Sequence, residues 1–308
     1  MALSLEVFLL AVAFDLLFGE PPAKIHPVVW IGRLITFLHK RAQPTRFQGL
    51  LLAILVVFAT VFLGSLIVWI ADYIPLLGTL VAAYFLKSTF SVKCLLQTAS
   101  DIGKMIDKDL SSAKAMLPAL VGRETKDLTK EQASSAVIES LSENYVDTII
   151  SPIFYFLLFE PFGLGLQASL GFKAISTMDS MLGYKKKGLK EIGFAPAKMD
   201  DLANFVPARL SILFIALAQP SRAKAAFSAA FRYHKATPSP NSGWPMSACA
   251  GSMGVRLEKP GFYVLMEGER QPGTSDIPHA VRLIGLASTL TLGTAILLLL
   301  ASIIFIQP

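Results

Sequence analysis

Two long uncharged runs restrict this chain more than any other feature of its sequence. Leu50–Ala71 contains no charged residue across 22 positions. As an α-helix this run spans about 33 Å at 1.5 Å per residue, which matches the hydrocarbon core of a bilayer. Leu283–Ile306 is a second uncharged run, rich in Leu and Ile. The sequence therefore predicts two transmembrane helices.

The composition supports a membrane protein and argues against other classes. Hydrophobic residues make up 53% of the chain and charged residues only 16%, with a mean hydropathy of +0.56, which is unlike an ordinary soluble domain. Segment 1–18 is apolar but has no basic start, so we expect a membrane-embedded helix rather than a cleaved signal peptide. Cys94 and Cys249 are far apart in the sequence, so they predict neither a disulfide framework nor a zinc site. The net charge of +6 is not organised with aromatics as a nucleic-acid-binding module.

The basic residues predict the topology. Of the 28 Lys and Arg residues, 26 fall in four stretches, 19–49, 93–148, 172–202 and 219–282, which the positive-inside rule places in the cytoplasm. We therefore expect an all-α polytopic membrane protein with cytoplasmic helical loops, in a single membrane-embedded domain. The expected membrane segments are 1–18, 50–71, 74–92, 149–171, 203–218 and 283–306.

Two of these segments leave alternatives open. Glu160-Pro161-Phe162-Gly163 interrupts 149–171, because Pro removes a hydrogen-bond donor and Gly eases a turn. This favours a re-entrant helical hairpin, and the rival is a full crossing. Segment 203–218 contains Pro207 and Arg209 and either dips into the membrane or crosses it. The stretch 93–135 is expected to be helical with a break near Pro118, and 236–262 is expected to be an ordered loop.

An acidic stripe marks the strongest candidate for a functional site. On a helix, Glu139, Glu143 and Asp147 fall at i, i+4 and i+8 and share one face, and each like-charge pair costs roughly 0.2–0.5 kcal/mol. Val137, Leu141 and Tyr145 give the same helix an apolar face. A solvated surface stripe is the ordinary interpretation. The apolar segment that follows favours a bound cation instead, either a divalent ion or a substrate ammonium.

Seven motifs occur in the order typical of one family. They are Asp15…Gly19-Glu20-Pro21 with His26-Pro27 and Trp30-Ile31-Gly32; Lys87-Ser88-Thr89-Phe90; Leu120-Val121-Gly122-Arg123-Glu124-Thr125; Glu139–Asp147 with Ser151-Pro152; Thr177-Met178-Asp179-Ser180-Met181-Leu182-Gly183-Tyr184; Asp200-Asp201-Leu202-Ala203-Asn204 with Pro207-Ala208-Arg209-Leu210; and Ser239-Pro240-Asn241-Ser242-Gly243-Trp244-Pro245 with Leu257-Glu258-Lys259-Pro260-Gly261. Over nearly its whole length the chain resembles the CobD/CbiB family of cobalamin biosynthesis, the membrane-associated adenosylcobinamide-phosphate synthases. A minor departure is Ser176, where the family pattern has Asn.

The resemblance implies an amide ligation. A propionate carboxylate of adenosylcobyric acid is joined to aminopropanol or its phosphate ester, with ATP and Mg²⁺ as implied cofactors. The chain has no Gly-x-x-x-x-Gly-Lys-Ser/Thr loop, so an ATP site would not be a P-loop. The expected partners are these small molecules and the lipid bilayer, with no nucleic acid, and the expected location is the cell membrane with the site facing the cytoplasm. A homo-oligomer or contact with other cobalamin-pathway enzymes stays open. The rival functions are an AmpE-like membrane sensor or regulator and a small-solute transporter.

Individual roles follow from residue type. Lys87 is either a snorkelling lysine at the interface or a phosphate or carboxylate ligand within the bundle. Asp200 is a candidate N-cap, His26 is a structural hydrogen-bonding histidine, and Trp244 is a candidate cover for a flat ring. The predicted catalytic residues are Glu143, Asp147, Lys87 and Asp201. The predicted substrate-binding residues are Arg123, Asn144, Asp179, Asn204, Arg209, Asn241 and Trp244, and the predicted metal ligands are Glu139, Glu143 and Asp147.

Overall fold

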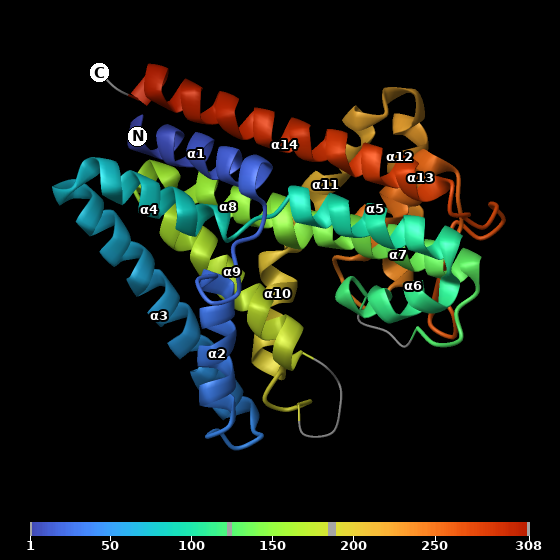
Figure 1. The fold of residues 1–308 in the computed structure, drawn as a ribbon, viewed down its shortest axis with the longest axis horizontal. Helices are drawn as coiled ribbons and strands as arrows, with labels where there is room; N and C mark the ends of the chain where they lie inside the picture. The colour runs from blue at the N-terminus through green and yellow to red at the C-terminus, as the bar shows by residue number, and fades with distance from the viewer. Residues whose placement is uncertain (1, 122–124, 184–188, 307–308) are drawn as a thin grey trace. The chain divides into compact units, whose positions relative to one another are not determined.

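The computed structural model describes residues 2–121, 125–183 and 189–306 and is predominantly helical (Figure 1). In the described residues the strands form one short hairpin. The all-α prediction is therefore confirmed. Contacts divide the chain into two compact units. Unit 1 comprises Met1–Ser91, Ser151–Asn204 and Gly293–Pro308, and unit 2 comprises Val92–Ile150 and Phe205–Leu292.

Unit 1 is built on the long apolar helix α3 (Arg46–Tyr73) and its partners. Its helices are α1 (Ala2–Phe18), α2 (Pro27–His39), α3 (Arg46–Tyr73), α4 (Pro75–Lys87), α8 (Ser151–Phe159), α9 (Gly165–Leu182), α10 (Phe194–Ala203) and the end of α14 (Asp276–Ile306). Helices α3 and α4 form a hairpin, and α9 packs on α3, α8 and α10 (Figure 1). Gly78 allows the α3–α4 approach, because a Cβ there would lie 2.2 Å from the Ala71 Cα. The resulting core includes Ile35, Val56 and Met178.

Helices α8 and α9 form a helical hairpin at the predicted break. Helix α8 ends in a 3-10 turn, Glu160–Phe162, and Gly163 follows with φ +70°, a left-handed conformation that glycine adopts at little cost. Helix α9 then returns along α8. The break predicted at 160–163 is present, and the position of this hairpin relative to a membrane stays a prediction.

The helices of unit 2 pack around one buried helix that is rich in small side chains, α13 (Gly243–Met253). Its elements are α5 (Lys93–Lys108), α6 (Leu110–Met116), α7 (Lys130–Tyr145), the π turn Val146–Ile150, α11 (Phe205–Ala218), α12 (Ala223–Tyr233), α13 (Gly243–Met253), β1 (Leu257–Lys259), β2 (Tyr263–Leu265) and the start of α14. Pro118 lies in the 3-10 turn that follows α6, which confirms the predicted break. Strands β1 and β2 pair antiparallel with Lys259 opposite Tyr263.

The prediction of an ordered loop over 236–262 is wrong at 243–253, which is helical, and at 257–259, which is a strand. Gly243–Met253 forms α13, every residue of which is buried, against α7, α11 and α12. Gly, Ser and Ala suit this helix because their small side chains let neighbouring backbones approach. A Cβ at Gly251 would lie 2.5 Å from the Ala225 carbonyl oxygen. Gly243 and Pro245 fall in the first turn, where proline is tolerated.

Within the residues that the structure describes, three helical segments have the length and composition to cross a membrane, so the chain is a polytopic membrane protein. They are Arg46–Tyr73, Lys130–Phe162 and Asp276–Ile304, and the bent pair α10 and α11 would make a fourth. The first contains the uncharged run Leu50–Ala71, and the third contains all but the last two residues of the run Leu283–Ile306. Helix α1, with 17 residues, and α4, with 13 residues, fall short of this length. Helix α4 ends at Lys87, and the Ser88 and Thr89 hydroxyls donate to the carbonyls of Phe85 and Leu86 in its last turn.

Candidate functional site

The three acids of the stripe lie in three different environments. Glu139 is 1% exposed, Glu143 is exposed and Asp147 is half-buried. The π turn Val146–Ile150 follows α7 directly. It holds more residues per turn than an α-helix, so it shifts Asp147 away from the i+4 row, and such turns are common at functional sites. Burial of Glu139 excludes a purely solvated stripe.

Glu139 anchors a hydrogen-bonded group of residues in unit 2, the Glu139 cluster (Ser135, Glu139, Tyr263, Glu258 and Arg256). The Ser135 hydroxyl donates to Glu139 Oε1 at 2.8 Å, and the Tyr263 hydroxyl donates to Glu139 Oε2 at 2.6 Å. The Glu258 amide donates to Ser135 Oγ at 2.8 Å, and Arg256 pairs with the Glu258 carboxylate. Hydroxyl donors offset the cost of burying a carboxylate, so the cluster ties α7 to the β-hairpin.

The predicted metal site is not preformed. In the ranges that the structure describes, no three His, Cys, Asp or Glu side chains are grouped so that they could hold a metal ion. Glu139, Glu143 and Asp147 therefore do not fit Mg²⁺ as a three-carboxylate set in this arrangement. Asn144, between the last two acids, donates from Nδ2 to the Ser140 carbonyl at 2.9 Å and to the Ser140 hydroxyl at 3.0 Å, so its amide nitrogen is engaged within α7. The roles of Glu143, Asp147 and Asn144 stay predictions.

A second group in unit 2, the Arg209 clamp (Phe205, Arg209, Asn241, Trp244 and His234), joins three predicted substrate-binding residues. Arg209 donates to Asn241 Oδ1 and to the Phe205 carbonyl, both at 2.7 Å. Its guanidinium lies 3.7 Å from the Phe205 ring centroid and 4.9 Å from that of Trp244. Trp244 also stacks on His234 at 3.8 Å and is 7% exposed. Its ring is thus covered by side chains of this chain rather than open to a flat ligand.

In unit 1, Lys87 belongs to a charged group, the Lys87 cluster (Asp15, Glu20, His26 and Lys87). Its side chain is 2% exposed, and its ammonium lies 2.7 Å from Glu20 Oε1 and 3.4 Å from Asp15 Oδ1. The snorkelling interpretation is wrong, because a snorkelling lysine would reach solvent. His26 accepts from the Val28 amide at 3.2 Å as the N-cap of α2 and bonds Glu20 Oε2 at 2.6 Å, as expected of a structural histidine.

The environment of Glu20 keeps it ionised. Partial burial raises the pKa of its carboxyl, but hydrogen bonds with His26 and Lys87 outweigh burial and lower the pKa to about 2. Lys87 is thus offset by two carboxylates. In this arrangement its charge stabilises unit 1, and a phosphate would have to displace a carboxylate to reach it.

The remaining predicted residues of unit 1 surround the end of α10. Asp200 accepts from Asn204 Nδ2 at 2.9 Å, and Asn204 Oδ1 accepts from the Ser151 hydroxyl at 2.6 Å. Asp200 is in the last turn of α10, so its N-cap interpretation is wrong. Asp201 pairs with Lys198 at 2.8 Å. Asn204 therefore links α8 to α10 through its hydrogen bonds with Ser151 and Asp200. Burial, together with the nearby Asp201 charge, raises the pKa of Asp179 to about 6.

The sequence-predicted residues therefore fall into separate groups. Unit 2 holds the acidic stripe, the Glu139 cluster and the Arg209 clamp, whereas unit 1 holds Lys87 and the residues at the end of α10. Arg123 lies outside the described residues. Ser135 and Tyr263 were missed. Ser135 carried a signal, since it precedes Glu139 by one helical turn, whereas Tyr263 lies too far away in sequence to be paired with Glu139 by pattern.

Comparison with known proteins identifies the family. The model of the CobD/Cbib protein family matches residues 8–288. The chain belongs to the CobD/CbiB family. It is 47% identical over 306 residues to a probable cobalamin biosynthesis protein CobD of Methanothrix thermoacetophila, covering 96% of this chain and 97% of the relative. No solved structure matches the chain significantly.

Other members of the CobD/CbiB family give the same result. A probable cobalamin biosynthesis protein CobD of Thermococcus kodakarensis is 40% identical, with 93% of this chain and 92% of the relative covered. The cobalamin biosynthesis protein CobD of Pelobacter propionicus is 41% identical, with 83% and 81% covered. Because coverage is high on both sides, the family relationship concerns the whole chain and not one segment.

Proposed function

We propose that this protein is a membrane-embedded enzyme of cobalamin biosynthesis that forms an amide between a corrinoid carboxylate and an aminopropanol-type amine. The observation that carries the proposal is the family match over residues 8–288, together with relatives named as cobalamin biosynthesis proteins. The candidate spans support a site at a membrane. We further propose that the membrane is the cell membrane and that the site faces the cytoplasm.

The proposed reaction consumes one ATP for each amide bond. A propionate carboxylate of adenosylcobyric acid takes up a phosphoryl group from ATP, which releases ADP. The amine nitrogen of aminopropanol, or of its phosphate ester, then attacks the activated carbon. A C–N bond forms, the C–O bond to phosphate breaks, and the amine gives up a proton to a base. The products are the amide, ADP and phosphate.

Residues of unit 2 supply groups that suit these steps. Glu143 is exposed and Asp147 is half-buried, so either carboxylate can meet a substrate ammonium and accept its proton. Arg209 contributes a cation that suits a carboxylate or phosphate. Ser135 and Tyr263 hold the buried Glu139 on the same helix as Glu143, and we assign Glu139 a positioning role.

The direct test uses the full chain purified in detergent. The protein is incubated with adenosylcobyric acid, aminopropanol phosphate or aminopropanol, ATP and Mg²⁺, and the products are read by mass. We expect the amide and ADP in equal amounts, with omission of ATP as the control. Cleavage of ATP without amide, or no reaction with either amine, would contradict the proposal.

A cellular test separates the proposed enzyme from its rivals. Cells that lack the protein should accumulate adenosylcobyric acid and recover cobalamin synthesis when supplied with cobinamide, which already carries the amide. Loss of a transporter would be relieved by external substrate without this accumulation. Loss of a regulator would leave the ligation measurable in extracts.

A further inference from the structure

Helix α12 has two unlike sides. Its three buried residues are alanines, and this side packs on α13 (Figure 1). On the other side, Phe227 and Phe231 are four positions apart, so they lie on one face of the helix. Their side chains are 38% and 64% exposed. The helix is therefore held in unit 2 by small side chains, and its two large aromatic rings point outward.

The exposed face of α12 is also basic. Lys224 lies three positions before Phe227, and Lys235 lies four positions after Phe231, in the 3-10 turn that follows the helix. These spacings place each lysine next to a ring. Both lysines are exposed, and in the described part of the chain neither pairs with a carboxylate. Segment 202–257 contains no Asp or Glu, so this excess of positive charge suits an anionic partner.

Two other cations of this region already face groups of unit 2. Arg222 donates from Nε to the Ser252 carbonyl, at 3.3 Å, near the end of α13. Arg232 lines a cavity of 410 Å³ together with Glu267 and Glu269, which offset its charge on that edge of α12. The two lysines of the exposed face are thus the cations that remain for a partner outside the chain.

A hydrogen bond sets the level of α12 relative to a membrane span. Gln219, between α11 and α12, lies 3.3 Å from His279 in the first turn of α14, measured from Oε1 to Nε2. Helix α14 contains a candidate span, and its uncharged run begins at Leu283, about 6 Å further along the helix. In α11, the apolar Leu217 is 53% exposed just before Gln219. Because the apolar parts of both helices end at this level, α12 begins at the membrane interface.

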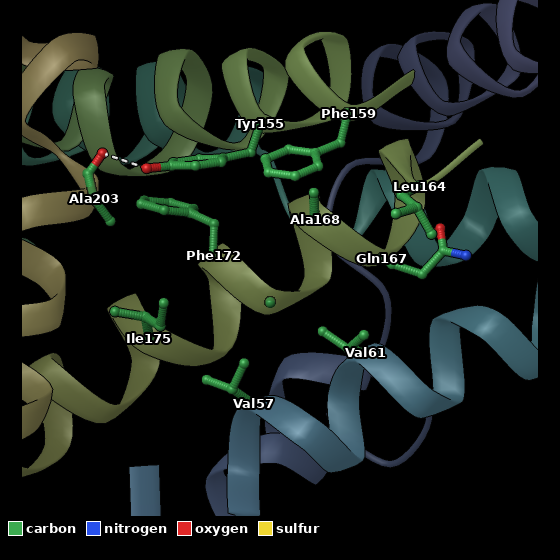
Figure 2. A pocket seen from close by; sticks show the side chains of 11 residues that line it. Val57, Val61, Tyr155, Phe159, Leu164, Gln167, Ala168, Phe172, Ile175 and Ala203 are labelled. Atoms are coloured by element: carbon green, nitrogen blue, oxygen red, sulfur yellow. Dashed lines mark hydrogen bonds between the residues drawn. The ribbon is translucent and has the colours of Figure 1, made fainter. Parts of the chain in front are cut away.

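The apolar groove of unit 1 differs from this face because it carries no charge. It lies between α3, α8 and α9, and its described lining, which includes Val57, Phe159 and Phe172, contains no charged residue (Figure 2). Any hydrocarbon would suit that groove, so its chemistry selects no ligand. The face of α12 combines aromatic rings with cations, which is typical of a helix that lies on an anionic membrane surface.

We propose that the α12 face (Lys224, Phe227, Phe231 and Lys235) docks on a bilayer surface that contains anionic phospholipids. The two rings enter the boundary between head groups and acyl chains. The lysine stems lie along this apolar surface and place their ammonium groups at the lipid phosphates. A soluble anion would pair with the lysines but leave the rings in water, whereas a bilayer accommodates both.

The experiment identifies the lipid that meets α12 in the full chain reconstituted in liposomes. A bimane fluorophore is attached at Ser228→Cys, an exposed position on α12, in a Cys94→Ser background. A brief reaction leaves Cys249 unlabelled because it is buried. The liposomes contain equal amounts of phosphatidylglycerol and phosphatidylcholine, and bromine, which quenches bimane, is placed on the acyl chains of one lipid or the other.

We expect brominated phosphatidylglycerol to quench more strongly than brominated phosphatidylcholine. Each lysine should contribute about a fivefold preference, the factor that corresponds to about 1 kcal/mol. Lys224→Gln with Lys235→Gln should bring the ratio of quenching by the two lipids close to one. Phe227→Ser with Phe231→Ser should instead weaken quenching by both lipids, because the face then leaves the bilayer surface.

Two controls test whether the preference comes from the charges of this face. Lys108→Gln with Lys126→Gln removes two exposed lysines elsewhere in unit 2 and should leave the ratio unchanged. Raising the salt concentration from 0.1 to 1 M shortens the Debye length from about 10 Å to about 3 Å, so it should lower the ratio in the protein that keeps Lys224 and Lys235.

Four results would overturn the proposal. Equal quenching by the two lipids would exclude selection of an anionic lipid, and no quenching by either would exclude docking on the bilayer. A preference that persists without Lys224 and Lys235 would exclude these lysines as its cause. Loss of quenching in a crosslinked dimer would assign the face to a second copy. If Ser228→Cys does not fold, Ser221→Cys, exposed before α12, carries the fluorophore. The proposal does not depend on the ligation activity.

Discussion

Two cations within apolar segments of this chain have opposite surroundings. Lys87 is buried and pairs with Glu20 and Asp15. Arg209 is held by carbonyl and amide oxygens and by aromatic rings, and within the described ranges it pairs with no carboxylate. Both residues stood out in the sequence for the same reason, a charge in an apolar stretch. The difference teaches that an apolar setting alone does not identify a ligand-binding cation. The charge that its own chain leaves uncompensated is the better candidate.

The largest expected effect is structural. Lys87→Met leaves Asp15 and Glu20 without their cation, and breaking a buried ion pair in this way costs about 3–5 kcal/mol. Thermal unfolding in detergent should show a strongly lowered Tm. Lys104→Met, which removes an exposed pair with Asp101, is the matched control, and we expect at most about 1 kcal/mol. Adding Asp15→Asn to Lys87→Met should recover part of the loss. An unchanged Tm in Lys87→Met would show that the ion pairs of Lys87 do not stabilise the protein, and would contradict the distinction drawn between Lys87 and Arg209.

The second largest effect is expected on catalysis, at Glu143, the exposed acid of the stripe. Glu143→Gln should lower the rate of amide formation by about 10²–10⁴-fold, the usual contribution of a general base. The Tm should stay near that of the wild type because Glu143 is exposed. Glu139→Gln should instead lower the Tm, since it replaces one of the two buried oxygens that accept the Ser135 and Tyr263 hydroxyls. Near-normal turnover in Glu143→Gln would show that the base lies elsewhere.

Arg209 should show a smaller effect on substrate affinity. If its uncompensated charge meets an anionic substrate, Arg209→Gln should raise the KM for that substrate by about tenfold or more, as expected from loss of a charged hydrogen bond. The KM of Arg209→Lys should lie between those of the wild type and of Arg209→Gln, because lysine keeps the charge but loses the planar contacts of the guanidinium. Separate titration of the corrinoid and the amine phosphate identifies the affected substrate. A changed kcat with constant KM would argue for a role outside binding.

The smallest expected effect is on pH dependence within unit 1. The folded-state pKa of Asp179, about 6, lies above its ordinary value of 3.8, so its contribution to stability is present below pH 3.8 and is lost as pH rises to 6. Glu20 has the opposite sign, because its pKa falls from 4.5 to about 2 and its contribution is lost only as pH drops through that range. Asp179→Asn should therefore flatten the Tm between pH 4 and 6. An identical Tm profile in the variant would show that Asp179 does not titrate as described.

Local pattern explains what could be predicted. The uncharged runs predicted the long helices α3 and α14, and Pro161 with Gly163 predicted the α8–α9 turn, since both signals depend on a few adjacent residues. The family could be recognised because its seven motifs occur along the chain in the expected order. Helix α13 could not be predicted in this way, because Gly, Pro and Ser usually favour loops, and its stability comes from close packing against α12 rather than from propensity.

The site was harder to predict than the fold. The partners of Lys87 and Glu139 come from distant parts of the sequence, 67 positions away for Glu20 and 124 for Tyr263. Spacing rules cannot find such pairs. The π turn after Tyr145 also breaks the regular spacing that placed Asp147 in the acidic stripe, so the position of Asp147 relative to Glu139 and Glu143 could not be predicted by pattern.

The close packing of α13 has a consequence for experiments. Cys249 is fully buried in that helix, and burial raises the pKa of its thiol to about 12, so it is almost never a thiolate at neutral pH. The chain has one other cysteine, Cys94, which is partly exposed. A thiol reagent should thus reach Cys249 only during transient openings of unit 2. The rate at which Cys249 is modified therefore measures how often unit 2 opens.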